Sequence, residues 1–477
     1  MLSNFLKTFV ILIIIVYLMW GFSDSYSASN IDNIAHITAI AIDQNDNPSA
    51  DLKVSFQFVD VSGSGGGSGG GSESSSSSNV IIIGVTSNTI DNAISKLNAY
   101  IGKQVNLSHC RNLIFSRDFA SEGIATEIFT LINNVQMRPF TNIVISTSDA
   151  SDYLKNSNPN VEELISKYYD TFELTSNFTG YSDDATLGKF YDNILRSKAG
   201  NTAILGETFA EVSSKSDSGN SSQSSSSANF QSSSDESSQS SEQGNNSQSG
   251  GNSKSSSGVA SQSSEQDSNS QSSSNSQSNS SSQSANDDSP PILDESAQRG
   301  TRNVGIAVFN NDTYIGELSS KESMYHLLVT NNIDSFEISV PIENYHKNIL
   351  NFRISPYKAS KISVDTSSET PVIHLEVFCE AHVLSIESKK DYGNIDFINN
   401  TCPIIENYIK ENISSYLNRT SKEFQVDIAN FYAVARSNFL TIPEWNNYNW
   451  NEKYKNANFS IDVNVNLNSQ LLYIENQ

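Results

Sequence analysis

The sequence predicts an α+β protein of more than one domain, in which mixed β-sheets are flanked by helices and a long Ser-rich insertion is disordered. Strand-like and helix-like apolar patterns alternate in two blocks, residues 29–211 and 291–477. Between them, residues 212–290 consist mainly of Ser, Gln, Asn and Gly. This tract holds too few apolar side chains to offset the ordering of its backbone, about 1–2 kcal/mol per residue. The 477 residues are enough for two or three domains.

The first 28 residues have the pattern of a leader. Thr8–Phe22 is an unbroken apolar run that follows Lys7 and precedes small polar residues, as in a secretory signal peptide. An uncleaved membrane anchor is the alternative. About fifteen helical residues span roughly 22 Å, and adding Phe5 and Leu6 nearly closes the gap to a hydrocarbon core of about 30 Å. The sequence leaves both interpretations open, and either one places the rest of the chain outside the cytoplasm.

The first block begins with strands and continues with alternating helices and strands. Ile34–Ile42 is predicted to be a buried strand, and Leu52–Val61 alternates apolar and polar residues as a partner strand does. A flexible Gly/Ser loop at 63–78 follows. Thr89 is predicted to cap a helix, because apolar residues recur after it at helical spacing. Further strands are predicted at Val80–Val85, Arg111–Phe115 and Thr141–Ser146, and further helices at Ile124–Ile132 and from Ala150.

The second block begins with a hairpin and closes on a strand. Val304–Phe309 and Thr313–Leu318 flank a turn with two Asn residues. Ser319 is a suitable cap for a helix through Lys321–Thr330. Phe459–Leu467 alternates strictly, as a half-buried strand does. Further strands are predicted at Phe336–Val340, Leu350–Ser355, Lys361–Val364 and Val372–Ser385, and a helix at Ile404–Leu417.

Composition excludes several classes of function. The chain has 53 acidic and 29 basic residues and a formal net charge of −24, which argues against nucleic-acid binding. An apolar fraction of 36% is too low for a transporter with many membrane spans. Three cysteines, Cys110, Cys379 and Cys402, are too few for a disulfide scaffold. The sequence leaves open a bridge between Cys379 and Cys402.

The sequence contains no recognisable catalytic motif. It lacks a nucleophile elbow, a P-loop, an H-E-x-x-H motif and a dinucleotide-binding glycine motif in a strand–helix context. His109 and Cys110 are adjacent, but no second pair lies at ligand spacing. His374 and His382 are eight residues apart on a predicted strand, which places both on one face and is only a weak indication of zinc. We therefore predict no catalytic, cofactor-binding or metal-binding residue.

Short motifs in the first block follow a definite order. A strand closes on Asp43, a helix of the form T-x-x-x-A-x-x-x-L-N begins at Thr89, and His109 precedes a strand. The residues in these motifs are Ile31–Ala35, Ala39–Asp43, Thr89, Ala93, Leu97, Asn98, His109, Leu113–Phe115, Ala120, Gly123, Arg138 and Pro139. In this order they resemble the amino-terminal region of the Ger(x)C family, the C subunits of bacterial spore nutrient-germinant receptors.

The second block resembles the rest of that family. Its first hairpin has the form A-V-F…G-x-L, and its end combines a helix, a D-x-x-x-[FL] motif, two tryptophans and a last strand. The residues concerned are Ala307–Phe309, Gly316–Leu318, Asp427, Phe431, Trp445, Trp450 and Val463–Leu467. One departure concerns the leader, because Phe22 stands where the family has an acylated cysteine. The lipid anchor characteristic of the family cannot form there, so attachment falls to the leader or to partner subunits.

The resemblance implies a non-enzymatic subunit of a membrane germinant-receptor complex that acts in nutrient-triggered spore germination. Its implied partners are the integral-membrane A and B subunits, without nucleic acid or cofactor, and its implied location is the outer face of the spore inner membrane. The alternative is an exported protein that binds or hydrolyses cell-wall glycan, with Trp445 and Trp450 as a sugar platform and the Ser-rich tract as a spacer. A third interpretation is a degenerate relative that no longer assembles, suggested by Phe22.

Overall fold

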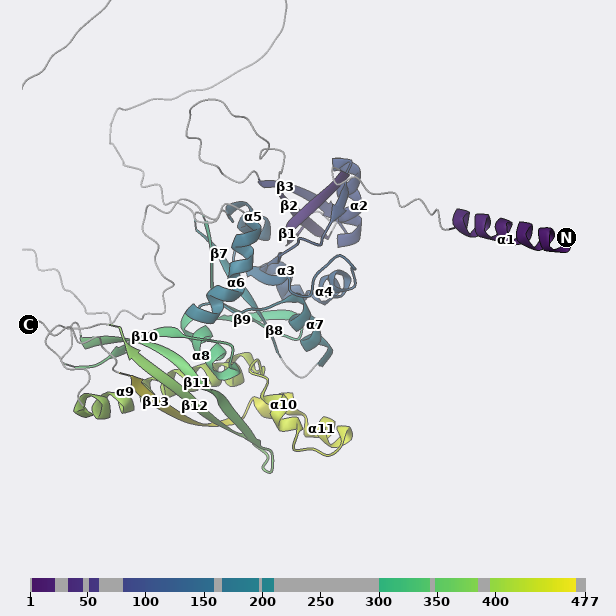
Figure 1. Ribbon diagram of the computed structural model, residues 1–477. Coiled ribbons are helices and arrows are strands. Elements are labelled where there is room, and N and C mark those ends of the chain that lie inside the picture. Colours follow the sequence, from purple (N-terminus) through teal and green to yellow (C-terminus); the bar gives the residue numbers. More distant parts are fainter. Residues whose placement is uncertain are drawn as a thin grey trace, which may run out of the picture. The chain divides into compact units, whose positions relative to one another are not determined.

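The computed structural model describes residues 2–21, 33–45, 51–59, 80–157, 165–196, 200–209, 300–343, 348–384 and 395–468. The described strands form a nine-stranded and a four-stranded sheet, with helices packed against them (Figure 1). The predicted class, mixed sheets flanked by helices, is confirmed. The predicted Ser-rich tract and the predicted Gly/Ser loop lie outside the described residues.

The centre of the nine-stranded sheet is parallel. Strands β1 (Ile34–Gln44), β5 (Asn112–Ser116), β6 (Asn142–Ser146) and β7 (Asn201–Phe209) lie side by side and run in one direction. The short strand β4 (Gln104–Asn106) pairs in parallel with the first residues of β1. Most residues of the four long strands are buried, as expected where helices cover both faces of a sheet. The amino-terminal ends of all these strands therefore form one edge of the sheet, and their carboxyl-terminal ends form the opposite edge.

Antiparallel strands flank this centre. On one side β2 (Leu52–Val59) pairs with β1, and β3 (Val80–Ser87) pairs with β2. On the other side β8 (Gly300–Asn310) pairs with β7, and β9 (Thr313–Leu318) pairs with β8. The predicted hairpin of the second block thus completes the sheet of the first block. The predicted domain division at residues 212–290 stays a prediction, and the sheet runs across it.

The helix predicted after Thr89 begins and ends at residues suited to these positions. The Thr89 hydroxyl accepts a hydrogen bond from the N–H of Asn92, and Gly102 ends that helix at φ +65°. In α1 the side chains of residues 9–17 are exposed. Within the described part of the chain, no helix combines the length and apolar character needed to cross a membrane. The helices are α1 (Leu2–Gly21), α2 (Ile90–Ile101), α3 (Arg117–Glu122), α4 (Ala125–Ile132), α5 (Ala150–Asn156), α6 (Ile165–Thr179) and α7 (Leu187–Arg196).

The second sheet has the order β10-β11-β12-β13. Strands β10 (Phe336–Pro341), β11 (Ile349–Asp365) and β12 (Val372–Val383) are antiparallel, and β13 (Asn458–Asn468) joins β12 in parallel. Two strands predicted within residues 350–364 are one strand, β11. Its register against β12 shifts between Pro356 and Lys361, so bulges take up the polar segment between the two apolar runs.

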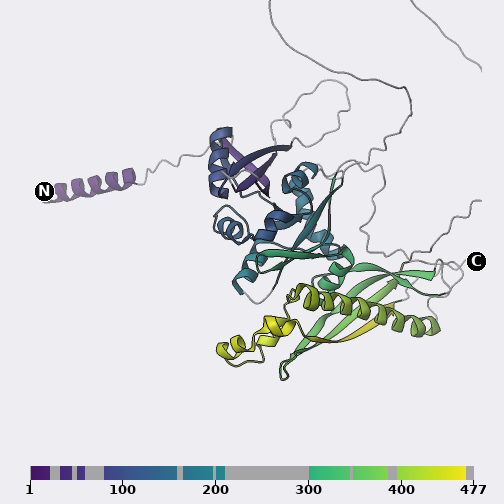
Figure 2. The same ribbon diagram turned by 180° about the vertical axis from the view of Figure 1, so that it is seen from behind.

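Helices cover the second sheet. In α8 (Ser320–Thr330), Ser319 and Glu322 form a capping box. The predicted helix at 404–417 is the later part of α9 (Ile395–Asn418), which lies along one face of the sheet (Figure 2). A π-helical turn, Arg419–Phe424, follows. Three short helices complete this half: α10 (Phe431–Arg436), α11 (Ile442–Tyr448) and α12 (Trp450–Tyr454).

The β7–β8 ladder generates a prediction about the tract between these strands. Phe209 and Gly300 face each other, so residues 210–299 connect two neighbouring strand ends. We expect replacement of these residues by a turn of about six residues to preserve the fold and raise the free energy of unfolding by about 2 kcal/mol. Each halving of a flexible loop lowers its closure penalty by about 0.6 kcal/mol. Urea denaturation of both proteins measures the difference. A loss of stability would show that the tract itself stabilises the fold.

Candidate functional site

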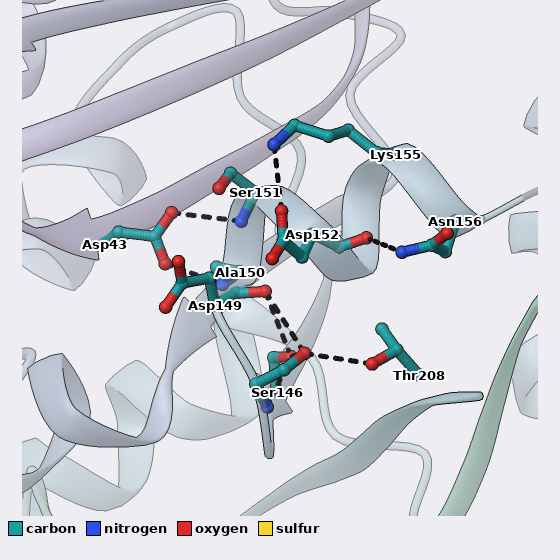
Figure 3. A network of polar contacts seen from close by, with 10 residues as sticks. Asp43, Ser146, Asp149, Ala150, Ser151, Asp152, Lys155, Asn156 and Thr208 are labelled. Atoms are coloured by element: carbon teal, nitrogen blue, oxygen red, sulfur yellow. Dashed lines mark hydrogen bonds and ion pairs between the residues drawn. The ribbon is translucent and has the colours of Figure 1, made fainter. Parts of the chain in front are cut away.

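A buried carboxylate joins the end of β1 to the start of α5 (Figure 3). Asp43 lies at the edge where the parallel strands end, and its carboxylate oxygens accept hydrogen bonds from the N–H groups of Ala150 at 2.6 Å and Ser151 at 3.0 Å. The residue directly before the helix, Asp149, makes no side-chain cap. Asp43 therefore caps a helix that lies more than 100 residues further along the chain.

The carboxyl ends of parallel strands are where open α/β sheets commonly bind ligands. In this protein, side chains at that edge bond to one another. Ser148 Oγ lies 3.2 Å from both Ser146 Oγ and Thr208 Oγ1. Burial raises the pKa of Asp43, and the bonds from Ala150 and Ser151 oppose that shift. The Asp43 carboxylate thus occupies the position at the amino terminus of α5 where an anion would bind.

The second half repeats this arrangement with Asp427. Its Oδ1 accepts a hydrogen bond from the N–H of Phe431 at 3.2 Å, and its Oδ2 accepts from the N–H of Tyr432 at 2.7 Å. Trp450 Nε1 donates to Oδ2 at 3.1 Å. Burial raises the pKa of Asp427 to about 6 despite these donors. Asp427 therefore caps α10 and fixes α12, so its carboxylate and the Trp450 indole both have a structural role in this chain.

The two tryptophans are part of the core. Trp445 is 5% exposed and Trp450 is 1% exposed, and their ring centroids lie 6.2 Å apart. Trp450 also packs on Tyr454, at 5.8 Å between centroids, and Trp445 packs on Phe439 at 5.4 Å. A sugar platform needs an aromatic face open to solvent. Neither ring offers one, so the glycan interpretation loses the residues on which it was based.

The histidines singled out by the sequence do not form a metal site. His109 packs edge-on against His36, with centroids 4.8 Å apart, and burial raises the pKa of Cys110 to about 12, which makes its thiol inert. His374 and His382 lie on the outward face of β12, as predicted, but eight residues of strand separate them by about 26 Å. No group of three or more His, Cys, Asp or Glu suited to a metal occurs in the described residues.

The cysteines are unpaired. Cys379 is buried on β12, where burial raises its pKa to about 12, and Cys402 is half-buried in α9. Burial also raises the pKa of Cys402. The bridge that the sequence left open between them is absent from the structure, in which all three thiols are free.

A cavity of about 400 Å³ lies where the two halves meet, and sequence reasoning missed it. Asp184 and Lys189 from the first half form an ion pair of 2.6 Å at its wall. From the second half, His326 is buried and bonds through Nδ1 to the Tyr416 hydroxyl at 2.7 Å. Burial lowers the pKa of His326 to about 4, so this imidazole is neutral. The charges of Asp184 and Lys189 therefore offset each other, and His326 is held by Tyr416. In the sequence, the adjacent acids Asp183 and Asp184 are the feature that could have indicated this cavity.

The raised pKa of Asp427 predicts a pH dependence of stability. An unfolded Asp titrates near 3.9, so between about pH 4 and 6 the folded chain holds more protons than the unfolded chain. The stabilisation contributed by protonated Asp427 is fully present below pH 4 and is lost as the pH rises through 6. This loss lowers the free energy of unfolding by roughly 2–3 kcal/mol. Asp427→Asn removes this titration. Urea denaturation between pH 4 and 7 should show the wild type losing stability relative to the variant. A constant difference would contradict the assignment.

The Trp450–Asp427 bond predicts unequal effects for the two tryptophans. Trp450→Phe removes a hydrogen bond to a buried carboxylate and should destabilise the protein by about 1.5–3 kcal/mol more than Trp445→Phe, which removes only packing. Thermal and urea unfolding of both variants measure the difference. In an Asp427→Asn background the excess should shrink. Equal effects in the wild-type background would show that the bond is energetically unimportant.

Family models of spore germination proteins match both halves of the chain. The family model "Spore germination protein N-terminal domain" matches residues 27–207, which include Asp43. The model "Spore germination B3/GerAC like, C-terminal" matches residues 304–470, which include Asp427 and Trp450. No curated protein matches the chain. A crystal structure of the GerBC protein aligns with a TM-score of 0.45 and 11% identity, over 90% of this chain and 98% of that one.

The two family matches lie in the order that the sequence motifs predicted, one in each half, and together they cover most of the chain. The chain therefore belongs to the GerAC-like family of spore germination proteins, the non-enzymatic C subunits of germinant receptors.

Proposed function

We propose that this receptor subunit is a rigid adaptor that works with integral-membrane A and B subunits at the outer face of the spore inner membrane. It acts through its surfaces, and its two halves keep partner contacts in a fixed relation while the receptor responds to nutrient. The observation that carries the proposal is the hydrogen-bonded union of the two family-matched halves through β7 and β8.

Close contacts between the halves support a rigid adaptor. The N–H of Gly200, just before β7, donates to the carbonyl of Asp427 at 2.8 Å. A Cβ atom on Gly200 would lie 2.2 Å from a methyl carbon of Val426, so the second half packs too closely on this residue to leave room for a side chain. The N–H of Gly305 donates to the carbonyl of Tyr181 at 2.6 Å. The first bond fixes the loop of Asp427 against the first half, and the second fixes β8 against it.

The domain organisation and leader belong to the same proposal. We take residues 29–211 and 291–477 as the two domains and 212–290 as a spacer that lengthens one hairpin connection. The leader, residues 1–28, holds the chain at the membrane if it is retained, and partner subunits hold it if it is cleaved, because Phe22 cannot be acylated as a cysteine is. Mass spectrometry of the amino terminus of the protein from spores distinguishes the two.

Deletion of the gene tests the proposal. We expect spores to form in normal numbers but to lose or blunt their germination response to nutrient, measured as the fall in optical density after nutrient is added. Reintroducing the wild-type gene should restore the response, and spores of both strains should stay viable when the germination step is bypassed. Normal germination in every nutrient condition would contradict the role.

Co-purification tests the partners. Affinity purification of the tagged chain from detergent-solubilised spore membranes should recover both integral-membrane subunits. Recovery of the folded chain without either subunit would favour the degenerate, non-assembling relative.

A further inference from the structure

One edge of the nine-stranded sheet carries an unusual surface. Strands β1, β4, β5 and β6 all begin at this edge, and the loops that precede β5 and β6 lie against each other. The N–H of Leu107 donates to Gln136 Oε1 at 3.0 Å, and Thr141 Oγ1 donates to the carbonyl of Cys110 at 3.1 Å. These bonds hold residues 107–111 and 133–141 together as one surface.

Two apolar side chains project from this surface. Val135 is fully exposed and Phe140 is 78% exposed. They lie on the loop between α4 and β6. The neighbouring residues hold this loop in place, so the two side chains stay exposed. Met137, between them, is buried, and Thr141 is bonded to both Cys110 and Arg138 carbonyls. A single exposed apolar residue is ordinary, but a fixed pair on one loop is a candidate contact surface.

A basic residue lies between the two apolar residues, although the whole chain carries a net charge of −24. Arg138 lies between Val135 and Phe140 in the sequence, and His109 packs on His36 nearby. Burial lowers the pKa of His109, and the nearby guanidinium groups of Arg138 and Arg111 lower it further. Arg111 is paired with Asp170 at 3.0 Å.

A second cation lies where the chain enters the sheet. Lys103 directly precedes β4, whose first residue, Gln104, pairs with Ile34 at the start of β1. In the described parts of the chain, no ion pair is formed by Lys103 or Arg138. Both charges are therefore available to an anionic partner.

The apolar helix α1 limits how far this edge of the sheet can lie from a membrane that holds the helix. Helix α1 ends at Gly21 and β1 begins at Ile34, so residues 22–33 connect them. Twelve residues reach at most about 40 Å even when fully extended. If α1 rests in or on a membrane, the edge from which β1 starts lies within that distance of it, whichever way the rest of the protein turns.

We propose that this surface, the leader-side patch (Lys103, His109, Val135, Arg138 and Phe140), rests on an anionic lipid bilayer. Val135 and Phe140 enter the interfacial layer, and Lys103 and Arg138 meet lipid phosphates. The proposal rests on the membrane location proposed above. Because the rest of the chain is acidic and is repelled by the same lipids, contact through this patch alone sets the orientation of the receptor subunit.

Tryptophan fluorescence in the full-length chain tests the patch directly. In a Trp20→Phe background, which removes the indole of the leader, Phe140→Trp places a reporter in the patch. Leu440→Trp is the matched control, because Leu440 is 97% exposed on the loop between α10 and α11. Each protein is mixed with phosphatidylcholine vesicles, with or without 30% phosphatidylglycerol, whose acyl chains carry bromine as a quencher. The parent without an added tryptophan supplies the background of Trp445 and Trp450.

With phosphatidylglycerol present, we expect bromine to quench the indole at 140 at least twofold and to leave the indole at 440 unchanged. Adding Lys103→Glu and Arg138→Glu should abolish the quenching at 140, with circular dichroism showing that the fold persists. Equal quenching at both positions, or none at position 140, overturns the proposal. The assay contains neither partner subunits nor nutrient, so its result is independent of germination. A dispensable gene would overturn the proposed function and leave the vesicle result standing.

Discussion

Each half of this protein depends on a buried carboxylate that accepts hydrogen bonds from the first N–H groups of a short helix, which have no acceptor within the helix. Helices of six or seven residues are not stable alone, because nucleation fixes several residues before enough hydrogen bonds form. Asp43 supplies the missing acceptors from a distant part of the chain, and Asp427 supplies them from the segment just before its helix. Removing the carboxylate would leave buried N–H groups without partners, whereas keeping it requires a charge to be desolvated. The raised pKa of Asp427 reflects that desolvation.

This constraint explains why the motif residues bind no ligand. Asp43, Asp427 and Trp450 look functional in the sequence because they are polar or aromatic residues at fixed places, yet their contacts are with other parts of the chain. In this chain the motif residues therefore brace the fold. The features available to partners are on the surface, at positions such as Phe140 that belong to no motif quoted from the sequence.

Local patterns predicted individual elements well. Thr89 caps α2, the capping box at Ser319 starts α8, and the alternation after Asn458 forms β13. Pairing between distant segments could not be derived in this way. Nothing near β8 indicates that it joins β7, and Asp43 carries no local sign of its helix, because both contacts depend on how segments about 100 residues apart come together. The junction cavity was missed for the same reason, since its wall draws on both halves.

The ladder between β7 and β8 has a consequence for the continuity of the polypeptide. Because strand pairing holds the two halves together, the peptide bonds of residues 210–299 are not needed for the halves to stay associated. A single proteolytic cut in this segment would leave a nicked but assembled subunit. The two fragments, synthesised separately, should reconstitute the native protein, as the pieces of a split reporter do.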